Sequence, residues 1–557
     1  MKSVSNRTSI GSAYLALNTN CDLAVLPLIC RHWQRFIGIH TNPIYHKAAL
    51  LHGYVQSTAV SLEDASRSYS SRSVGSVTGW KDLCRKRYLI EKSWSGNAPS
   101  RVTPHHGSGK FVHRIKVDEK AGYILTTSSV GGLKVIDMQD DRELWSLPDS
   151  HVRPYAHCEY GEGFIIFDYI DGSKEVWRRV DDFSVEEAAS VVPESLPRPR
   201  QKRVFAAALE KYRAAAETST RGHFRPWAVL HPPQTTRAFR FSYPTLGAAA
   251  WDTVYLWDVR TGTLVQTIDQ TQLGSNGEGE EDPALEFLGD INYIEVSEKY
   301  VFLCGIHSLR AFSRETGKSV LDIPSSRHPL AAWRYTISPN RPSAKAPGAS
   351  LIPQHIEARS VPRAESNIVD EFIAVHISSC GSHLVALLLS SRLLIIPFFE
   401  RAFQDGAGTY EIALEVQLGS PCHSSRYLAF EDGRIGACTK TGLFVVQPDW
   451  SEHSQQDADA APCLSVFRVP ALGDRSCLGA VSCLQMTDTG LFLNWDTQCL
   501  PEPHEVEQYD DAFYASVVDE TRFASLANGI EVTLVDLEQP EFDPESSTVV
   551  SVDFFPT

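Results

Sequence analysis

The 557-residue sequence lacks most of the signatures that assign a chain to an enzyme class, a metal site or an export route. None of its 12 cysteines forms a CxxC or CxxxC pair, so the spacing of zinc ribbons and thioredoxin-like sites is missing. The first residues contain no apolar run typical of a secretory signal. GxGxxG, HExxH, GxSxG and EF-hand patterns are also absent. We therefore expect no catalytic residues, no metal, no cofactor, and a reducing cytoplasmic or nuclear location.

A long uninterrupted hydrophobic run is missing too. The most apolar segment is Leu384–Phe399, but Ser390, Ser391 and Arg392 interrupt it, and each half has only the length of a strand. This pattern predicts two buried strands around a tight turn. We therefore expect no membrane contact.

Basic side chains are scarce outside the N-terminal part. Residues 1–115 carry 15 Lys and Arg against 5 Asp and Glu, whereas the remainder carries 37 against 63. The acidic majority argues against a nucleic-acid-binding body, because phosphate contacts need clustered cations. With 43% hydrophobic and 22% charged residues the balance is that of a globular protein. The asymmetry predicts two modules, one basic and helical, the other acidic.

The N-terminal part contains an amphipathic pattern, DLAVLPLICRHWQRF, over residues 22–36. Asp22 can cap the start of a helix there, while Pro27 predicts a kink or a late start. An ordinary core helix accounts for this periodicity when it is taken alone. Spacings of three and four place six residues on one apolar face: Leu23, Leu26, Ile29, Cys30, Trp33 and Phe36.

A second amphipathic helix is predicted over residues 79–96, GWKDLCRKRYLIEKSWSG. Its basic residues face solvent in this interpretation. A nucleic-acid role is the alternative, but no basic surface interleaved with aromatic residues surrounds the segment. The inward face is expected to carry Trp80, Leu83, Cys84 and Tyr88, and Trp94 closes the run.

From about residue 111 the texture changes to short β runs separated by Gly, Asp and Asn. The clearest unit is GAAAWDTVYLWDVRTGTLVQTI, in which alternating residues and a Gly turn predict antiparallel strands. Units repeated at intervals of about 40–55 residues indicate a β-propeller. We expect seven blades, with eight or six as alternatives, and residues 548–557 as a closing strand. The eight candidate units are 122–147, 164–180, 247–268, 300–323, 384–399, 427–450, 480–495 and 522–537.

The fold class predicted is thus a short α-helical N-terminal module followed by an all-β propeller. Residues 205–218 predict a helix, while the compositions of 271–286 and 325–367 predict disorder. The expected boundaries are a helical module at 1–60, a Ser-rich linker at 61–78, a connecting helix at 79–100, and the propeller at 110–557 with insertions at about 186–226, 271–286, 325–367 and 451–462.

The helical segments resemble a known family. The order Asp22-Leu23, Leu26, Ile29-Cys30-Arg31, Trp33, Phe36 is similar to the second half of an F-box, DLxxLxxVCRxWxxL. The family's Leu-Pro-x-Glu start is not found in residues 1–20. The segment Trp80–Trp94 resembles the tryptophan-bounded helix that joins the F-box to the propeller in F-box/propeller proteins.

The β units resemble WD-repeat propellers more loosely. Gly222-His223 precedes Trp257-Asp258 at a spacing usual in that family, and Trp495-Asp496 supplies another Trp-Asp pair. In the family the His and Asp belong to a hydrogen-bond network that fixes the strands of a blade. The resemblance therefore implies structural, not catalytic, roles for His223, Trp257, Asp258, Trp495 and Asp496.

Together the two resemblances imply a substrate-recognition subunit of a cullin-type (SCF) ubiquitin ligase. The F-box half would dock a Skp-type adaptor carried by the cullin scaffold, and the propeller would bind an unidentified target protein. The six residues from Leu23 to Phe36 would form the adaptor-binding face or the core of the module. A propeller scaffold that binds no adaptor is the alternative, and a propeller enzyme is a third.

Overall fold

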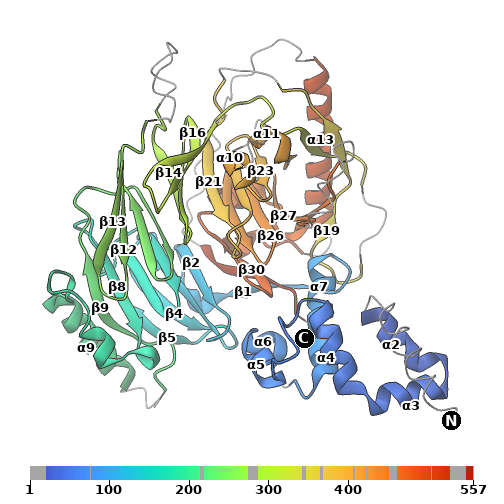
Figure 1. Cartoon of the computed structure of the whole chain (residues 1–557), viewed down its shortest axis with the longest axis horizontal. Helices are drawn as coiled ribbons and strands as arrows, with labels where there is room; N and C mark the ends of the chain where they lie inside the picture. The colour runs from blue at the N-terminus through green and yellow to red at the C-terminus, as the bar shows by residue number, and fades with distance from the viewer. Residues whose placement is uncertain are drawn as a thin grey trace.

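The computed structural model describes residues 20–75, 77–213, 219–273, 287–341, 346–363, 368–404, 408–421, 424–450, 461–502, 505–526 and 547–555. Within these residues seven sheets follow one another around a ring, all antiparallel except for the parallel pair of β18 and β24, and a group of helices extends from one side of it (Figure 1). The first strands of neighbouring blades contact each other around the central axis. The prediction of a helical N-terminal part followed by a seven-bladed propeller is confirmed, and eight or six blades are excluded.

Each blade is built on four strands, numbered here from the axis outward, and two of the sheets are extended by further strands at their outer edge. Blade 1 holds β2 (Val112–Asp118), β3 (Tyr123–Ser128), β4 (Leu133–Asp137) and β5 (Glu143–Leu147). Blade 2 holds β6 (Cys158–Gly161), β7 (Phe164–Asp168), β8 (Lys174–Arg179) and β9 (Phe224–Leu230). Blade 3 holds β10 (Ala238–Ser242), β11 (Thr245–Ala249), β12 (Thr253–Asp258) and β13 (Thr263–Asp269). Blade 4 holds β14 (Ile291–Val296), β15 (Tyr300–Gly305), β16 (Ser308–Ser313) and β17 (Ser319–Pro324).

Blade 5 begins with β21 (Phe372–Ile377), β22 (Leu384–Leu388), β23 (Arg392–Ile396) and β24 (Leu414–Gln417). Blade 6 holds β25 (Ser425–Glu431), β26 (Arg434–Thr439), β27 (Gly442–Pro448) and β28 (Leu464–Arg468). Blade 7 holds β29 (Leu484–Met486), β30 (Gly490–Asp496), β31 (Ser547–Asp553) and β1 (Arg101–His105). The predicted strand pair within Leu384–Phe399 corresponds to β22 and β23, and Ser391 makes the turn between them with a positive φ of 61°.

The ring is closed by strands from the two ends of the described chain. β31 lies between β30 and β1, so that Asp553 faces both Gly490 and Arg101. The closing strand predicted at the C-terminal end is therefore present in the last blade. Its outer partner begins at Arg101, ahead of the predicted boundary at residue 110. Closure of this kind pairs strand edges that would otherwise stay open.

Several expectations for the connecting segments were wrong. The segment 325–367, expected to be disordered, contains β18 (Trp333–Ile337), β19 (Ile352–Pro353) and β20 (Ile356–Ser360). β18 and β20 extend blade 5 beyond β24, and β19 pairs with β28 of blade 6. Composition misses these strands because β18 and β19 pair with blade edges that lie elsewhere in the sequence, and β20 pairs with β18.

Helices account for two further differences. The helix expected at 205–218 begins earlier, as α9 (Pro199–Arg213). The eighth candidate unit at 522–537 starts inside α13 (Val506–Leu526), whereas residues 527–537 lie outside the described residues. The expectations for 274–286 and 451–460 also lie outside them. Short helices in the remaining connections are α8 (Val185–Ala188), α10 (Arg401–Gln404), α11 (Thr409–Ile412) and α12 (Arg475–Ala480).

The N-terminal helices form what we call the helical arm. It consists of α2 (Asn20–Ile29), α3 (Arg31–Ile39), α4 (Thr41–Leu51), α5 (Leu62–Arg67), α6 (Ser71–Val74) and α7 (Trp80–Trp94). Two of these helices, α5 and α6, occupy the stretch predicted to be a Ser-rich linker. None of the helices among the described residues combines the length and the apolar character needed to span a bilayer.

Candidate functional site

The connecting helix α7 belongs to two hydrophobic cores. Its first half contributes Trp80, Leu83 and Cys84 to the core of the arm, and the ring of Trp80 stacks on His46 with 3.9 Å between centroids. Its second half contributes Ile90 and Trp94 to a core shared by blades 6 and 7. The helix therefore fastens the arm to the propeller, in the position that the sequence predicted.

A polar joint reinforces this attachment. Arg87, which is buried, donates to both carboxylate oxygens of Asp488, with 2.7 Å from Nη2 to Oδ1, and its guanidinium lies 4.1 Å from the ring centroid of Tyr69. Trp94 Nε1 donates to the Asp488 carbonyl at 2.9 Å. Tyr88, expected on the inward face, is only half-buried and lies beside Lys92. Arg87 occupies the buried position because Asp488 neutralises it there.

The predicted single helix over residues 22–36 is two helices. Cys30 has extended backbone angles, φ −160° and ψ 163°, and separates α2 from α3. The six residues therefore do not share one apolar face, because the extended backbone at Cys30 changes the direction of the chain between α2 and α3. Leu23 is buried with Ile37, whereas Ile29 and Cys30 are exposed. Half-burial is seen for Leu26, Trp33 and Phe36.

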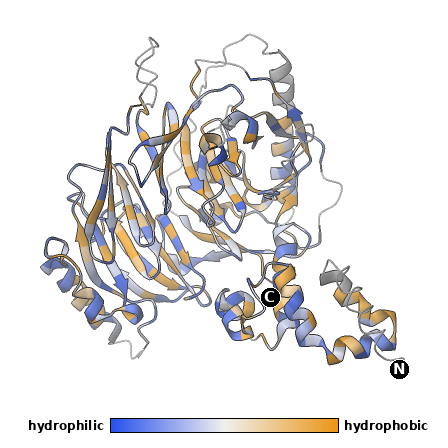
Figure 2. Ribbon diagram, viewed as in Figure 1, coloured by the Kyte–Doolittle hydropathy of each residue, from blue (hydrophilic) through white to orange (hydrophobic). Residues whose placement is uncertain are grey.

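The far end of the arm exposes an unusual number of apolar side chains. Leu28 at the end of α2 is 81% exposed, and Ile39 at the end of α3 is 77% exposed. Figure 2 shows hydrophobic residues along α2, α3 and α4 at this end of the molecule. Exposed apolar groups concentrated in one small module mark an interaction surface. We call this set the tip residues: Val25, Leu28, Ile29 and Ile39.

The axis of the propeller contains a chain of charged side chains, one from each of five successive first strands. Lys116 of β2 contacts Glu159 of β6 at 2.9 Å, and Arg240 of β10 contacts Glu159 at 3.4 Å. Arg240 also contacts Glu295 of β14 at 3.2 Å, and His376 of β21 contacts Glu295 at 2.6 Å. Each carboxylate thus bridges the cationic or imidazole side chains of neighbouring blades.

This axial chain is electrostatically balanced. Burial alone would raise the pKa of Glu159, but Lys116 and Arg240 outweigh it and hold that pKa far below its usual value. Burial likewise favours a higher pKa for Glu295, but Arg240 and His376 outweigh it and lower that pKa. The pKa of Arg240 rises well above its ordinary value, because both glutamates outweigh the effect of burial. Glu159, Glu295 and Arg240 therefore remain ionised at neutral pH, and the contacts of the chain tie blades 1 to 5 together.

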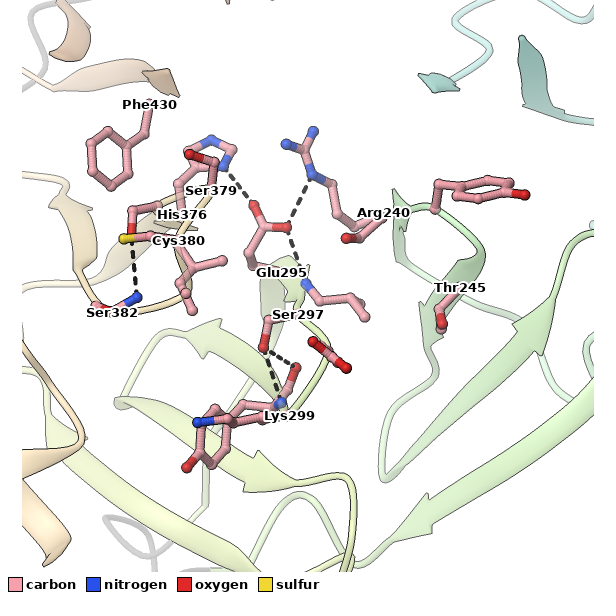
Figure 3. A pocket seen from close by; sticks show the side chains of 18 of the residues that line it. Arg240, Thr245, Glu295, Ser297, Lys299, His376, Ser379, Cys380, Ser382 and Phe430 are labelled. Carbon is pink, nitrogen blue, oxygen red and sulfur yellow. Dashed lines mark hydrogen bonds and ion pairs between the residues drawn. The ribbon is translucent and has the colours of Figure 1, made fainter. Parts of the chain in front are cut away.

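A cavity of about 760 Å³ opens onto the end of this chain. Figure 3 shows Glu295 at its floor between His376 and Arg240, with Lys299 and Ser297 on one wall and Cys380 and Ser382 on another. Its size is in the range of a pocket for a small molecule or a few side chains. The walls come from turns that follow the first strands of blades 3 to 6: residues 242–245, 296–300, 377–382 and 430–433.

The walls of the cavity carry both signs of charge. Lys299 forms an ion pair with Glu400 at 3.0 Å, and Arg314 donates to the Ser297 carbonyl at 2.8 Å. Burial lowers the pKa of Arg314, and burial together with Asp432 raises the pKa of Glu431. Such a mixed surface offers hydrogen-bonding groups and charges of both signs to a polar ligand.

The arm and the cavity lie on the same face of the ring. Asp488, which holds Arg87 and Trp94, lies in the turn between the first and second strands of blade 7. The cavity is built from the equivalent turns of blades 3 to 6. Because the first strands of a propeller run in the same direction, all of these turns project from one face.

The Trp-Asp pairs singled out in the sequence are not equivalent in the structure. Trp257 is buried on β12, the third strand of blade 3, and Asp258 pairs with Arg260 at 2.6 Å. Trp495 is buried on β30, the second strand of blade 7, and Asp496 accepts the Gln498 N–H at 2.9 Å.

His223 lies just before β9, and its carbonyl accepts the N–H of Val180 at 2.9 Å while its ring packs against Tyr212.

A buried side-chain hydrogen-bond network is found instead around Glu175, on β8 of blade 2. Glu175 Oε2 accepts from Trp177 Nε1 at 3.0 Å and contacts His151 Nε2 at 2.9 Å. Both partners are fully buried around this carboxylate. No Trp-Asp or Gly-His pair marks this triad in the sequence, so the motif search passed over it.

No protein-family model matches the chain, and no curated protein matches its sequence. Solved structures do match. The WD40 repeats of RRP9 cover 71% of this chain and 90% of that chain, at 8% identity and a TM-score of 0.40. The β-propeller domain of Myceliophteria thermophila Cps50 (Swd1) covers 72% and 98%, at 8% identity and 0.38. The computationally designed Ika8 protein covers 69% and 93%, at 12% identity and 0.35. At these sequence identities and TM-scores the three structures carry no argument about this chain. The assignment of the fold rests on the seven sheets of the structure itself.

Proposed function

We propose that this protein is a non-catalytic interaction subunit that joins two partners, and specifically a substrate-recognition subunit of a cullin-type ubiquitin ligase. The arm docks a Skp-type adaptor, and the propeller binds a target protein. The carrying observation is the set of exposed tip residues at the end of a helical arm that a buried joint fastens to the propeller.

The tip residues support the first half of this proposal. Leu28, Ile29 and Ile39 lie outside the core of the arm, so they are available to a partner without unfolding it. Burying an apolar side chain of this size is worth about 1.5–3 kcal/mol, so a few of them suffice for a stable complex. The resemblance of residues 22–36 to the second half of an F-box favours a Skp-type adaptor as that partner.

The cavity supports the second half. It lies on the same face as the joint between arm and propeller, so a target bound there sits on the side of the ring from which the arm extends. A receptor of this kind acts by proximity, because it raises the effective concentration of the target near the ubiquitin-loaded enzyme. Its mixed charges suit a polar peptide segment.

The adaptor half is tested by pull-down of purified Skp-type adaptor with the full chain and with the double variant Leu28→Asp, Ile29→Asp. Both side chains are exposed, so the variant should fold with an unchanged melting temperature. We expect at least about a hundredfold weaker capture, because each aspartate must be desolvated in the interface. Ile170→Asp is the matched control, since Ile170 is 75% exposed on the propeller.

Failure of the intact chain to capture the adaptor would leave a propeller scaffold that binds its partners without a ligase. Target binding by the cavity is tested in a separate experiment. Lys299→Glu and Arg314→Gln alter the cavity wall, and crosslinked partners of the full chain are compared between these variants and the intact protein. Partners lost with these variants but kept with Leu28→Asp, Ile29→Asp are cavity partners.

A further inference from the structure

Three side chains with metal-binding atoms meet where the chain passes from blade 6 to blade 7. The Asp474 carboxylate and the Cys477 and Cys499 thiols each offer one atom, and these atoms lie within 4.8 Å of one another. Asp474 and Cys477 come from α12 and the residue before it, and Cys499 comes from the single turn Thr497–Cys499 that follows β30. Two thiols and a carboxylate on two separate segments form a closed group of the kind that binds a cation.

The geometry fits a tetrahedral zinc ion. With Zn–S bonds of about 2.3 Å and Zn–O bonds of about 2.0 Å, the ligand atoms around zinc lie roughly 3.5–3.8 Å apart. The separations within the group allow this after small side-chain rotations. Cys477 is 2% exposed, whereas Asp474 and Cys499 are half-buried, so an entry path and a position for a water ligand remain.

Hydrogen bonds hold the ligands in place. Asp474 Oδ1 accepts the Cys477 N–H at 2.9 Å and the Ser476 hydroxyl at 2.5 Å. Asp496 Oδ1 accepts the Gln498 N–H at 2.9 Å and so fixes the turn that carries Cys499. Such outer contacts orient ligands before a metal arrives.

The Asp474 carboxylate has no cationic partner in the described part of the chain. No lysine, arginine or histidine there forms an ion pair with it. A metal ion would therefore displace no existing salt bridge at this group.

We propose that Asp474, Cys477 and Cys499 bind one Zn²⁺, with water as the fourth ligand. Binding breaks the two S–H bonds, forms two Zn–S bonds and releases two protons to solvent, so affinity rises with pH. The ion fastens α12 to the turn after β30, and both segments contact blade 7. It is a structural zinc at the blade that closes the ring, and it is independent of the proposed ligase function.

The test uses the full chain, stripped of metal with a chelator and kept in a reductant that does not bind metal. Co²⁺ is titrated and followed by its thiolate charge-transfer and visible d–d absorption, and Zn²⁺ is then added in competition. We expect saturation at one equivalent of Co²⁺, displacement by one equivalent of Zn²⁺, and a higher melting temperature with zinc.

Two ligand variants and one control separate this site from others. Asp474→Asn keeps the helix cap, because asparagine caps as well as aspartate, and should weaken zinc at least about tenfold. Cys499→Ser should remove about half of the charge-transfer intensity, since it leaves one thiolate. Cys380→Ser, which removes an exposed thiol in the cavity wall, should leave the Co²⁺ absorption and the zinc affinity unchanged.

The proposal is overturned by absence of charge-transfer absorption, by equal zinc affinity in Asp474→Asn and the intact chain, or by loss of the absorption in Cys380→Ser. A Cys477–Cys499 disulfide that persists in reductant, seen by mass spectrometry, overturns it as well. Melting of each variant without metal shows whether it has folded, and Asp474→Asn alone decides the matter if Cys499→Ser does not fold.

Discussion

The helical arm and the propeller differ in which side chains they bury and which they expose. The propeller buries charge, with Glu159 and Glu295 enclosed at its axis between cations of neighbouring blades. The arm instead exposes apolar groups, such as Leu28 and Ile39, at its far end. A buried ionic chain can be satisfied only by fixed neighbours, which suits a rigid ring. Exposed apolar side chains lower the free energy only when something covers them, which suits a docking module.

The helix α7 packs into the cores of both regions, and the largest expected effect comes from weakening its contact with the propeller. Trp94→Ala removes a fully buried ring and its hydrogen bond to Asp488. We expect a loss of about 3–5 kcal/mol in the free energy of unfolding, measured by denaturant titration. Trp33→Ala, at a half-buried position in the arm, should cost less than half as much. Equal losses in the two variants would show that the contact of Trp94 with the propeller contributes no more to stability than an ordinary half-buried position in the arm.

The second prediction concerns pH at the same junction. Glu119 accepts from Thr487 Oγ1 at 2.7 Å and from Thr489, and its backbone carbonyl accepts from Ser70 of the arm. Burial raises the pKa of Glu119 from 4.5 to about 7, although both threonines oppose the shift. The folded state thus holds this proton more tightly than the unfolded state. Ionisation therefore destabilises the fold progressively as the pH rises from about 4.5 to about 7, and the cost is constant above that.

Glu119→Gln cannot ionise and keeps an oxygen for both threonines. It should leave the free energy of unfolding unchanged near pH 4.5 and raise it by up to about 3 kcal/mol at pH 8. Denaturant titrations of both proteins across this pH range measure the difference. A difference that is constant with pH would show that Glu119 does not titrate in this window.

A matched pair of hydroxyl deletions asks whether arm and propeller unfold together. Tyr54→Phe removes a bond of 2.9 Å to Glu91 in the arm, and Tyr514→Phe removes one of 2.8 Å to Gln354 in the propeller. Each should cost about 1 kcal/mol. Because the two modules share the α7 joint, we expect one thermal transition that both variants lower alike. Two transitions, with Tyr54→Phe lowering only the first, would show that the arm unfolds by itself.

The smallest effect on stability is expected at the tip residues. Leu28→Asp should change the free energy of unfolding by no more than about 0.5 kcal/mol, because the side chain has no core contacts to lose. Leu23→Asp, five residues earlier but buried, should cost several kcal/mol by placing a charge in the core of the arm. The pair is compared by thermal melting. A large loss of stability in Leu28→Asp would show that Leu28 belongs to the core of the arm and not to a docking surface.

Much of the propeller could be predicted from its local sequence. Alternating apolar residues and turns such as Asp432-Gly433, whose φ angles are both positive, specify strands and hairpins without distant partners. The strands β18, β19 and β20 could not be predicted in this way. β18 pairs with β24 and β19 with β28, both far away in the sequence, and β20 in turn pairs with β18.

The candidate site was predicted less fully. The positions of Trp80, Leu83 and Trp94 followed from helical spacing, because a helix core repeats every three to four residues. The break at Cys30 was not foreseen, and it sends Ile29 to the surface that the periodicity had assigned to one buried face. The cavity has no local signal, since each wall is a short turn on a different blade.

By itself, then, the sequence determined most of the blade strands and the connecting helix, that the sheet units repeat, and that the N-terminal helices form a separate basic module. These features depend on local spacing and composition, which the chain carries at every position. Only the tertiary structure decided which side chains stay exposed on the arm, which charges meet at the axis, and that Asp474, Cys477 and Cys499 converge. Those outcomes depend on contacts between segments far apart in the chain, and ring closure brings them together.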